Sequence, residues 1–133
     1  MERTRKGSGW SRAPILRGTL DMLVLKSVSS TPRHGWAIAR WITRASGLEL
    51  QIDDGSLHPA LRRLEERGLL VARWGLSEQN RRARYYRIST AGKRALNSML
   101  SEWAAFSAAI STTLARSALA AARRARTRYG SQR

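Results

Sequence analysis

Apolar residues near the start of the chain recur every three to four positions, the spacing that places side chains on one face of a helix. The stripe from Leu16 to Val28 predicts a first helix over residues 16–30. A second stripe predicts another helix over residues 36–46, which Gly47 ends. The ordered part of the chain is therefore expected to begin with two short amphipathic helices.

The stretch DDGSLHPALRRLEERG, residues 53–68, predicts a third helix with a proline near its start. Asp54 or Ser56 can accept hydrogen bonds from the free N–H groups of the first turn, and Pro59 is tolerated where no internal N–H bond is lost. Gly68 is expected to end the helix. The buried stripe is predicted to consist of Leu57, Leu61, Leu64 and Leu69. The remaining faces carry Ser56, His58, Arg62, Arg63, Glu66 and Arg67.

Alternating apolar and polar residues predict strands in three places. A short one is expected at LELQI, residues 48–52, and a pair at residues 69–74 and 84–89. Nine polar or flexible residues separate the members of the pair, too many for a tight hairpin turn. Residues 75–84 are therefore predicted to form a wing, a long basic loop. Its arginines are Arg81, Arg82 and Arg84.

From Thr90 the apolar positions return to helical spacing and predict a final helix over residues 90–118. Their heptad-like series extends over almost three heptads, a pattern typical of helices that pack along their length. We interpret this segment as a dimerisation helix. Its candidate interface residues are Leu96, Met99, Leu100, Trp103, Phe106 and Ile110.

Charge indicates the class of partner. The chain has 25 Lys and Arg against 9 Asp and Glu, a formal net charge of +16, and 22 of its bases are arginine. The excess lies in residues 1–17 (net +4), residues 62–94 (net +7) and residues 115–133, which hold six bases and no acid. Clustered guanidinium groups favour a phosphate-bearing partner. Residues 1–14 are interpreted as a flexible basic arm and residues 119–133 as a basic tail, whose arginines would add nonspecific affinity or extend the final helix.

Other chemistry finds no support in the sequence. There is no cysteine, which excludes disulfides and thiolate metal sites and fits a reducing cytoplasm. The apolar run at residues 20–25 is too short and too charged for a signal or a membrane span. His34 and His58 alone do not make a zinc site, and the GSG at residues 7–9 follows no strand and is not a phosphate loop. We expect no enzyme, cofactor, metal or membrane partner.

The expected order of elements, helix–helix–strand–helix–strand–wing–strand–helix, is that of a winged helix-turn-helix with residues 55–68 as recognition helix. Blocks of the sequence in that order resemble the PadR family of bacterial transcriptional regulators, over about residues 15–114. They are GTLDMLVLKSVS (18–29), HGWAIARWI (34–42), GSLHPALRRLEERGLL (55–70), NRRARYYRISTAGKRAL (80–96) and the tryptophan-bearing final helix. The resemblance implies a mostly α fold with a small β-wing: a DNA-binding domain at 15–89 followed by a C-terminal dimerisation helix.

The resemblance also implies a function, that of a homodimeric regulator, usually a repressor, bound to a pseudo-palindromic operator. In the family the final helix builds the dimer with the first helix. Some members respond to phenolic or planar hydrophobic molecules, so a flat effector between paired Trp103 side chains is a further hypothesis beside a plain dimer core. The family usually has tyrosine where this chain has His58, so its sequence preference cannot be inherited.

The predicted contacts to double-stranded DNA fall on the recognition helix and the wing. Arg62 and Arg63 are expected to reach a guanine edge and a phosphate in the major groove, although pairing with Glu66 along the helix is an alternative. The helix N-terminus favours a phosphate, and the wing arginines are expected to follow the backbone or the minor groove. The full set is Ser56, His58, Pro59, Arg62, Arg63, Arg81, Arg82 and Arg84.

Two other functions stay open from the sequence. One is a sequence-indifferent nucleic-acid binder, nucleoid-like or RNA-associated, that uses the basic tails and the wing alone. The other is an adapter whose winged helix binds an acidic protein. The arginine tails favour the indifferent binder, whereas the ordered recognition helix argues against it.

Overall fold

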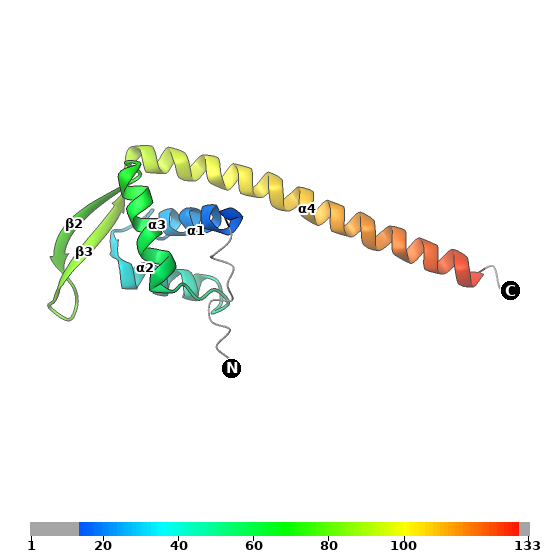
Figure 1. The fold of residues 1–133 in the computed structure, drawn as a ribbon, viewed down its shortest axis with the longest axis horizontal. Coiled ribbons are helices and arrows are strands. Elements are labelled where there is room, and N and C mark those ends of the chain that lie inside the picture. Colours follow the sequence, from blue (N-terminus) through cyan, green and yellow to red (C-terminus); the bar gives the residue numbers. More distant parts are fainter. Residues whose placement is uncertain (1–13, 131–133) are drawn as a thin grey trace. The chain divides into compact units, whose positions relative to one another are not determined.

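The computed structural model describes residues 14–130, which are mostly helical and include one small sheet (Figure 1). The elements in order are α1 (Pro14–Ser27), β1 (Arg33–His34), α2 (Gly35–Ala45), α3 (Asp54–Glu66), β2 (Leu70–Leu76), β3 (Arg82–Ile88) and α4 (Thr90–Gly130). The chain divides into two compact units, one through Asn97 and one from Ser98. The predicted arm lies outside the described residues except for Pro14, where α1 begins. The predicted winged helix-turn-helix class, with a long C-terminal helix, is confirmed.

The sheet has three antiparallel strands in the order β1-β3-β2. In the hairpin, β2 and β3 stay paired from Leu70 opposite Ile88 to Leu76 opposite Arg82. The connecting loop is therefore residues 77–81, much shorter than predicted. The prediction was wrong because Gly75 and its partner across the hairpin, an alanine, resemble loop residues in the sequence, whereas both belong to the ladder.

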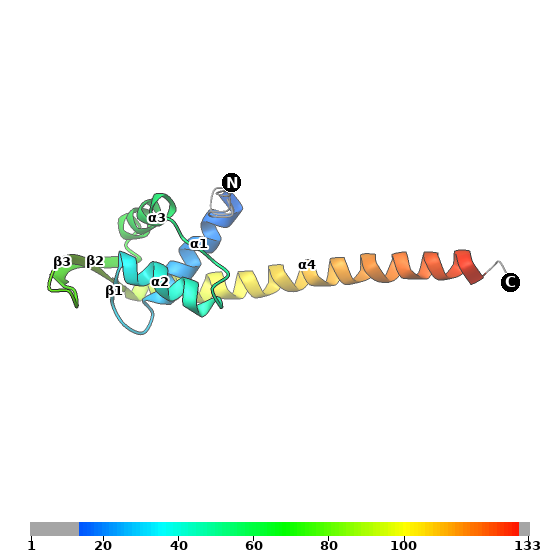
Figure 2. The same cartoon turned by 90° about the horizontal axis from the view of Figure 1, so that it is seen from below.

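The other strand predictions also need correction. Arg33 and His34 form β1 and pair with β3, a strand that was not predicted because it is too short to show alternation in the sequence. Residues 48–52 form no strand. Instead Gly47 and Leu48 take left-handed backbone angles (φ 68° and 69°), and the chain runs irregularly to α3 (Figure 2). Gly47 therefore ends α2 as predicted, by a conformation that favours glycine.

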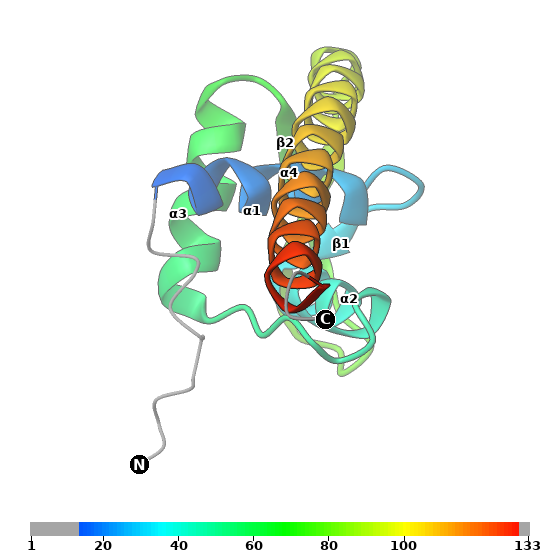
Figure 3. The same cartoon turned by 90° about the vertical axis from the view of Figure 1, so that its right-hand side faces the viewer.

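The core of the first unit lies among the three short helices and the sheet. Figure 3 shows α1 crossing α3, and both helices contact each other through apolar side chains. The leucine stripe predicted for the third helix is buried as expected. The core consists of Leu20, Met22, Val24, Leu25, Val28, Ile38, Ile42, Leu57, Ala60, Leu61, Leu64, Leu69, Leu70, Tyr86, Ile88 and Leu96.

The cap of α3 lies one residue before Asp54, the earlier of the two predicted capping residues. The N-cap is Asp53, whose Oδ1 accepts a hydrogen bond from the Ser56 N–H at 2.9 Å. Pro59 consequently lies inside the helix, in its second turn, where its missing N–H leaves the Gly55 carbonyl without its usual helical donor. Both residues are exposed, so water can satisfy that carbonyl. Gly68 ends the helix with φ 75°, as predicted.

The last helix is longer than predicted. It begins after Ser89, whose hydroxyl accepts a hydrogen bond from the Gly92 N–H at 2.9 Å, and it continues to Gly130. Most of the segment interpreted as a basic tail, 119–133, is therefore helical, while residues 131–133 lie outside the described range. Alanine, leucine and arginine dominate residues 114–126 and are strong helix formers, which accounts for the extension.

Gly92 is the glycine at which the fold leaves no room for a side chain. A Cβ there would press on the Leu69 carbonyl oxygen and lie 2.8 Å from Ile88 Cγ1. We expect Gly92→Ala to lower the free energy of unfolding by about 2–3 kcal/mol, as overpacking does. Gly55→Ala is the matched control, since its Cβ would meet nothing within 4 Å. Urea denaturation followed by circular dichroism measures both, and equal stability of the two variants would contradict this packing.

Candidate nucleic-acid interface

The outer face of α3 presents polar side chains to solvent. His58, Pro59 and Arg62 are exposed, and Ser56 is half-buried. Within residues 14–130 the Arg62 side chain forms no ion pair or hydrogen bond. The alternative pairing of Arg62 with Glu66 is thus not formed, and the guanidinium is available to a ligand.

The neighbouring arginine has a different environment. The Nη2 of Arg63 donates to Asp21 Oδ1 on α1 at 2.7 Å, and the Asp21 side chain is only 9% exposed. The Arg63 Nε is buried and has no hydrogen-bond partner. Arg63 therefore attaches the recognition helix to α1. The sequence did show an acid within the apolar stripe of the first helix, and that acid was the available signal for this contact.

A second ion pair joins α3 to the sheet. Arg84 lies on β3, not in the hairpin loop, and its Nη2 donates to Glu65 Oε2 at 2.6 Å. The hydrogen bond and the negative charge of Glu65 raise the pKa of Arg84 above its ordinary value. Arg63 and Glu65, two residues apart, thus hold the helix to the elements on either side. Sequence reasoning missed both partners.

The basic end of the hairpin contains one tryptophan that the sequence analysis did not single out. Trp74 is 54% exposed, and the Arg82 guanidinium carbon lies 4.6 Å from its ring centroid. This cation–π contact orients Arg82 on the strand, while Arg81 stays exposed in the loop. Of the adjacent tyrosines, Tyr86 is buried and Tyr85 donates its hydroxyl to the Leu76 carbonyl at 3.0 Å.

A hollow of about 320 Å³ separates the start of α2 from α3 and β3. His34 and His58 both line it. His34 caps α2, since its Nδ1 accepts a hydrogen bond from the Ala37 N–H at 3.2 Å, and its ring lies edge-on to Tyr85. Within residues 14–130 no group of three or more potential ligands could hold a metal ion. His58 is thus the histidine left free to contact a ligand.

The candidate dimer residues of α4 fall into two groups. Leu96 is buried in the first unit and belongs to its core, contrary to the prediction that it forms an interface. In the second unit Met99 is half-buried, and the other predicted residues are exposed. These are Leu100, Trp103, Phe106 and Ile110. Trp103 and Phe106 contact each other, with ring centroids 6.2 Å apart, so a continuous apolar stripe is left uncovered in the single chain.

Residues 24–98 match the model of the transcriptional regulator PadR-like family, more than half of the chain. The chain belongs to the PadR-like family. The resemblance found in the sequence is thereby confirmed, and the family is one of transcriptional regulators.

Solved structures agree with the PadR-like assignment. A transcriptional regulator from Clostridium thermocellum is 25% identical, with a TM-score of 0.68 over 75% of this chain and 97% of its own. A PadR family transcriptional regulator from Eggerthella lenta is 31% identical, with a TM-score of 0.63 over 74% and 83%. Bacillus subtilis PadR, solved in complex with operator DNA, is 18% identical and matches in fold, with a TM-score of 0.55 over 62% and 47%.

No helix within residues 14–130 of this PadR-like chain is long and apolar enough to cross a membrane.

The Arg63–Asp21 pair should contribute to the stability of the PadR-like domain. Arg63→Gln leaves a buried carboxylate unpaired, and we expect it to lower the free energy of unfolding by about 2–4 kcal/mol. Arg62→Gln, the exposed neighbour without a partner, should change it by less than about 0.5 kcal/mol. Urea unfolding of both variants measures the difference. In the double variant Arg63→Gln with Asp21→Asn, part of the loss should return, and a purely additive loss would contradict the pairing.

Proposed function

We propose that the chain is a homodimeric repressor that binds a pseudo-palindromic operator through α3 and the β2–β3 hairpin and acts in the cytoplasm. The observation that carries this proposal is the Arg62 guanidinium, which is exposed and has no partner among the described residues, on a helix held in place from both sides. The operator complex of the Bacillus subtilis relative supports the DNA-binding part. Occupation of a promoter by the dimer would then block transcription.

In this proposal α3 enters the major groove. Arg62 pairs with a base edge, most favourably guanine O6 and N7, and His58 contacts a base or phosphate from the N-terminal half of the helix. Ser56 and Pro59, at the same end, lie against the backbone. Arg63 contributes indirectly, because its ion pair with Asp21 fixes the orientation of α3 relative to α1.

The hairpin supplies contacts that do not depend on sequence. Arg81 is exposed in the loop, and the Arg82 guanidinium lies over the Trp74 ring. Both guanidinium groups suit a phosphate or a narrow minor groove. Arg84 was predicted to do the same, but its charge is already paired with Glu65, so we assign it the role of positioning the hairpin.

The apolar stripe of α4 is proposed as the dimer interface. Two copies of the stripe would cover Trp103 and Phe106, and the dimer would place two recognition helices about one DNA turn apart. Trp103 is 45% exposed, so its ring is accessible in the single chain. A small planar hydrophobic effector stacked between paired Trp103 side chains is proposed to alter the angle between the helices and release DNA.

A sequence-indifferent nucleic-acid binder is the alternative. It is favoured by the C-terminal part of α4, where helical and exposed arginines occur without any acid. These are Arg116, Arg123, Arg124 and Arg126. Such a surface would bind any duplex by releasing counterions, with the same dependence on salt for every sequence.

Binding to the DNA upstream of the protein's own coding region separates the two functions. We expect that DNA to bind at least about 10³-fold more tightly than a scrambled duplex of equal length. Arg62→Ala should reduce this ratio, whereas Arg81→Ala should weaken both duplexes alike and reduce the salt slope by about 1. Fluorescence anisotropy over a salt series measures both quantities.

The control for this experiment is Arg94→Ala, an exposed arginine of α4 outside α3 and the hairpin. It should leave the ratio unchanged. Equal affinity for the two duplexes at every salt concentration, followed by a genomic selection that enriches no sequence, would rule out the repressor.

The dimer is tested by placing a charge in the stripe. Ile110→Glu buries a carboxylate between apolar side chains and should raise the dimer dissociation constant at least about 100-fold. Ser111→Glu, the exposed next residue on another face of the helix, is the matched control. Sedimentation equilibrium gives both constants. Identical constants for the two variants would place the interface elsewhere.

A further inference from the structure

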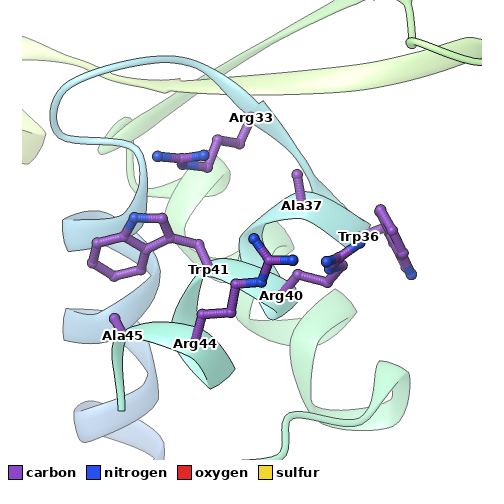
Figure 4. Close-up of a pocket in the computed structure, with 7 residues that line it drawn as sticks. All are labelled: Arg33, Trp36, Ala37, Arg40, Trp41, Arg44 and Ala45. Atoms are coloured by element: carbon purple, nitrogen blue, oxygen red, sulfur yellow. The ribbon is translucent and has the colours of Figure 1, made fainter. Parts of the chain in front are cut away.

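A second basic cluster lies on α2, away from the recognition helix face. Here a hollow of about 470 Å³ opens between β1 and the outer side of α2 (Figure 4). We call it the arginine hollow. It is lined by Arg33, Trp36, Ala37, Arg40, Trp41, Arg44 and Ala45.

The charges of the arginine hollow are not balanced within the protein. Its lining contains three arginines and no acid. Within residues 14–130 none of Arg33, Arg40 and Arg44 forms an ion pair. Arg40 and Arg44 are also one helical turn apart, a spacing at which like charges repel. An anion in the hollow would remove this repulsion.

Aromatic rings share the hollow with these charges. The Arg33 guanidinium carbon lies 5.8 Å from the Trp41 ring centroid, and its Nε donates to the Ser27 carbonyl at 2.6 Å. The Arg40 guanidinium carbon lies 4.6 Å from the ring centroid of Trp36, which is 62% exposed. In Figure 4 Arg33 extends from β1 above Trp41, while Arg40 and Arg44 extend from α2 between Trp41 and Trp36.

These features define the chemistry of a ligand. All side-chain polar groups of the lining, guanidinium and indole N–H, are donors, so the ligand must supply acceptors. Guanidinium forks match phosphate oxygens, and three of them suit more than one negative charge. The rings offer flat apolar faces, and the volume falls within the range of small-molecule sites, about 300–1,000 Å³. We propose that the arginine hollow binds a free nucleotide, its phosphates on the arginines and its base against the tryptophans.

The site goes beyond the proposed DNA contacts, because none of its residues belongs to α3 or the hairpin. Binding is measured without DNA, so its failure would leave the repressor proposal untouched. The probes are ADP, pyrophosphate, which has the phosphates without the base, and adenosine, which has the base without the phosphates. Isothermal titration calorimetry on the full chain at 150 mM salt is the measurement, since that salt suppresses weak attraction to the net charge.

We expect ADP to bind at least about tenfold more tightly than pyrophosphate or adenosine, because stacking and charge act together. Arg44→Gln removes charge-assisted hydrogen bonds and should weaken ADP about tenfold or more. Arg94→Gln, an exposed arginine elsewhere on the first unit, should leave ADP affinity within about twofold and controls for general attraction by the basic chain. Both positions are exposed, so thermal unfolding should be the same in both variants.

Three results would overturn the proposal. Pyrophosphate binding as tightly as ADP would show that the base adds nothing and that the hollow binds anions in general. Equal losses from Arg44→Gln and Arg94→Gln would assign the binding to net charge. Loss of operator affinity in Arg44→Gln with ADP affinity unchanged would make the arginine hollow part of the DNA interface.

Discussion

The orientation of α3 depends on one partly buried interaction, the ion pair between Arg63 and Asp21. A carboxylate inside the domain is unfavourable unless a cation accompanies it, and Arg63, held against α1, supplies that cation to Asp21. The leucines of α3 fix which face is buried, but apolar packing alone tolerates small rotations and shifts. The directional Arg63–Asp21 ion pair removes that freedom, together with the second ion pair between Glu65 and Arg84.

This constraint divides the arginines of the interface by role. Arg63 and Arg84 have their charges neutralised within the domain, so they give little attraction to DNA and determine instead where the helix and the hairpin lie. Arg62 and Arg81 form no ion pair within residues 14–130, so their charges are available to a ligand. Neighbouring arginines thus act differently because different side chains face them across the fold. Arg82 falls between the two groups, because the Trp74 ring positions its guanidinium without neutralising the charge.

The same division explains which features of α3 could be predicted from the sequence. The leucine stripe of α3 is a local pattern, and periodicity was enough to predict it. The partners of Arg63 and Arg84 lie 42 and 19 residues away in the chain, and no local pattern connects them. Asp21 is visible in the sequence as an acid within an apolar stripe, but nothing in the sequence connects it with Arg63. The two-residue strand at His34 was missed for a related reason. These residues form a strand because they pair with β3, and nothing in their own sequence predicts it.

A chain of this charge raises the question of how any DNA sequence could be preferred. In the proposed repressor, phosphate contacts from Arg81, Arg82 and the basic part of α4 contribute equally to every duplex, so they increase affinity and cancel in the ratio between sequences. The ratio is left to the few side chains that reach base edges, above all Arg62 and His58. A base contact discriminates only if its donor cannot move to a wrong base at little cost. The bracing of α3 by Arg63 is therefore a condition for specificity, although Arg63 itself need touch no base.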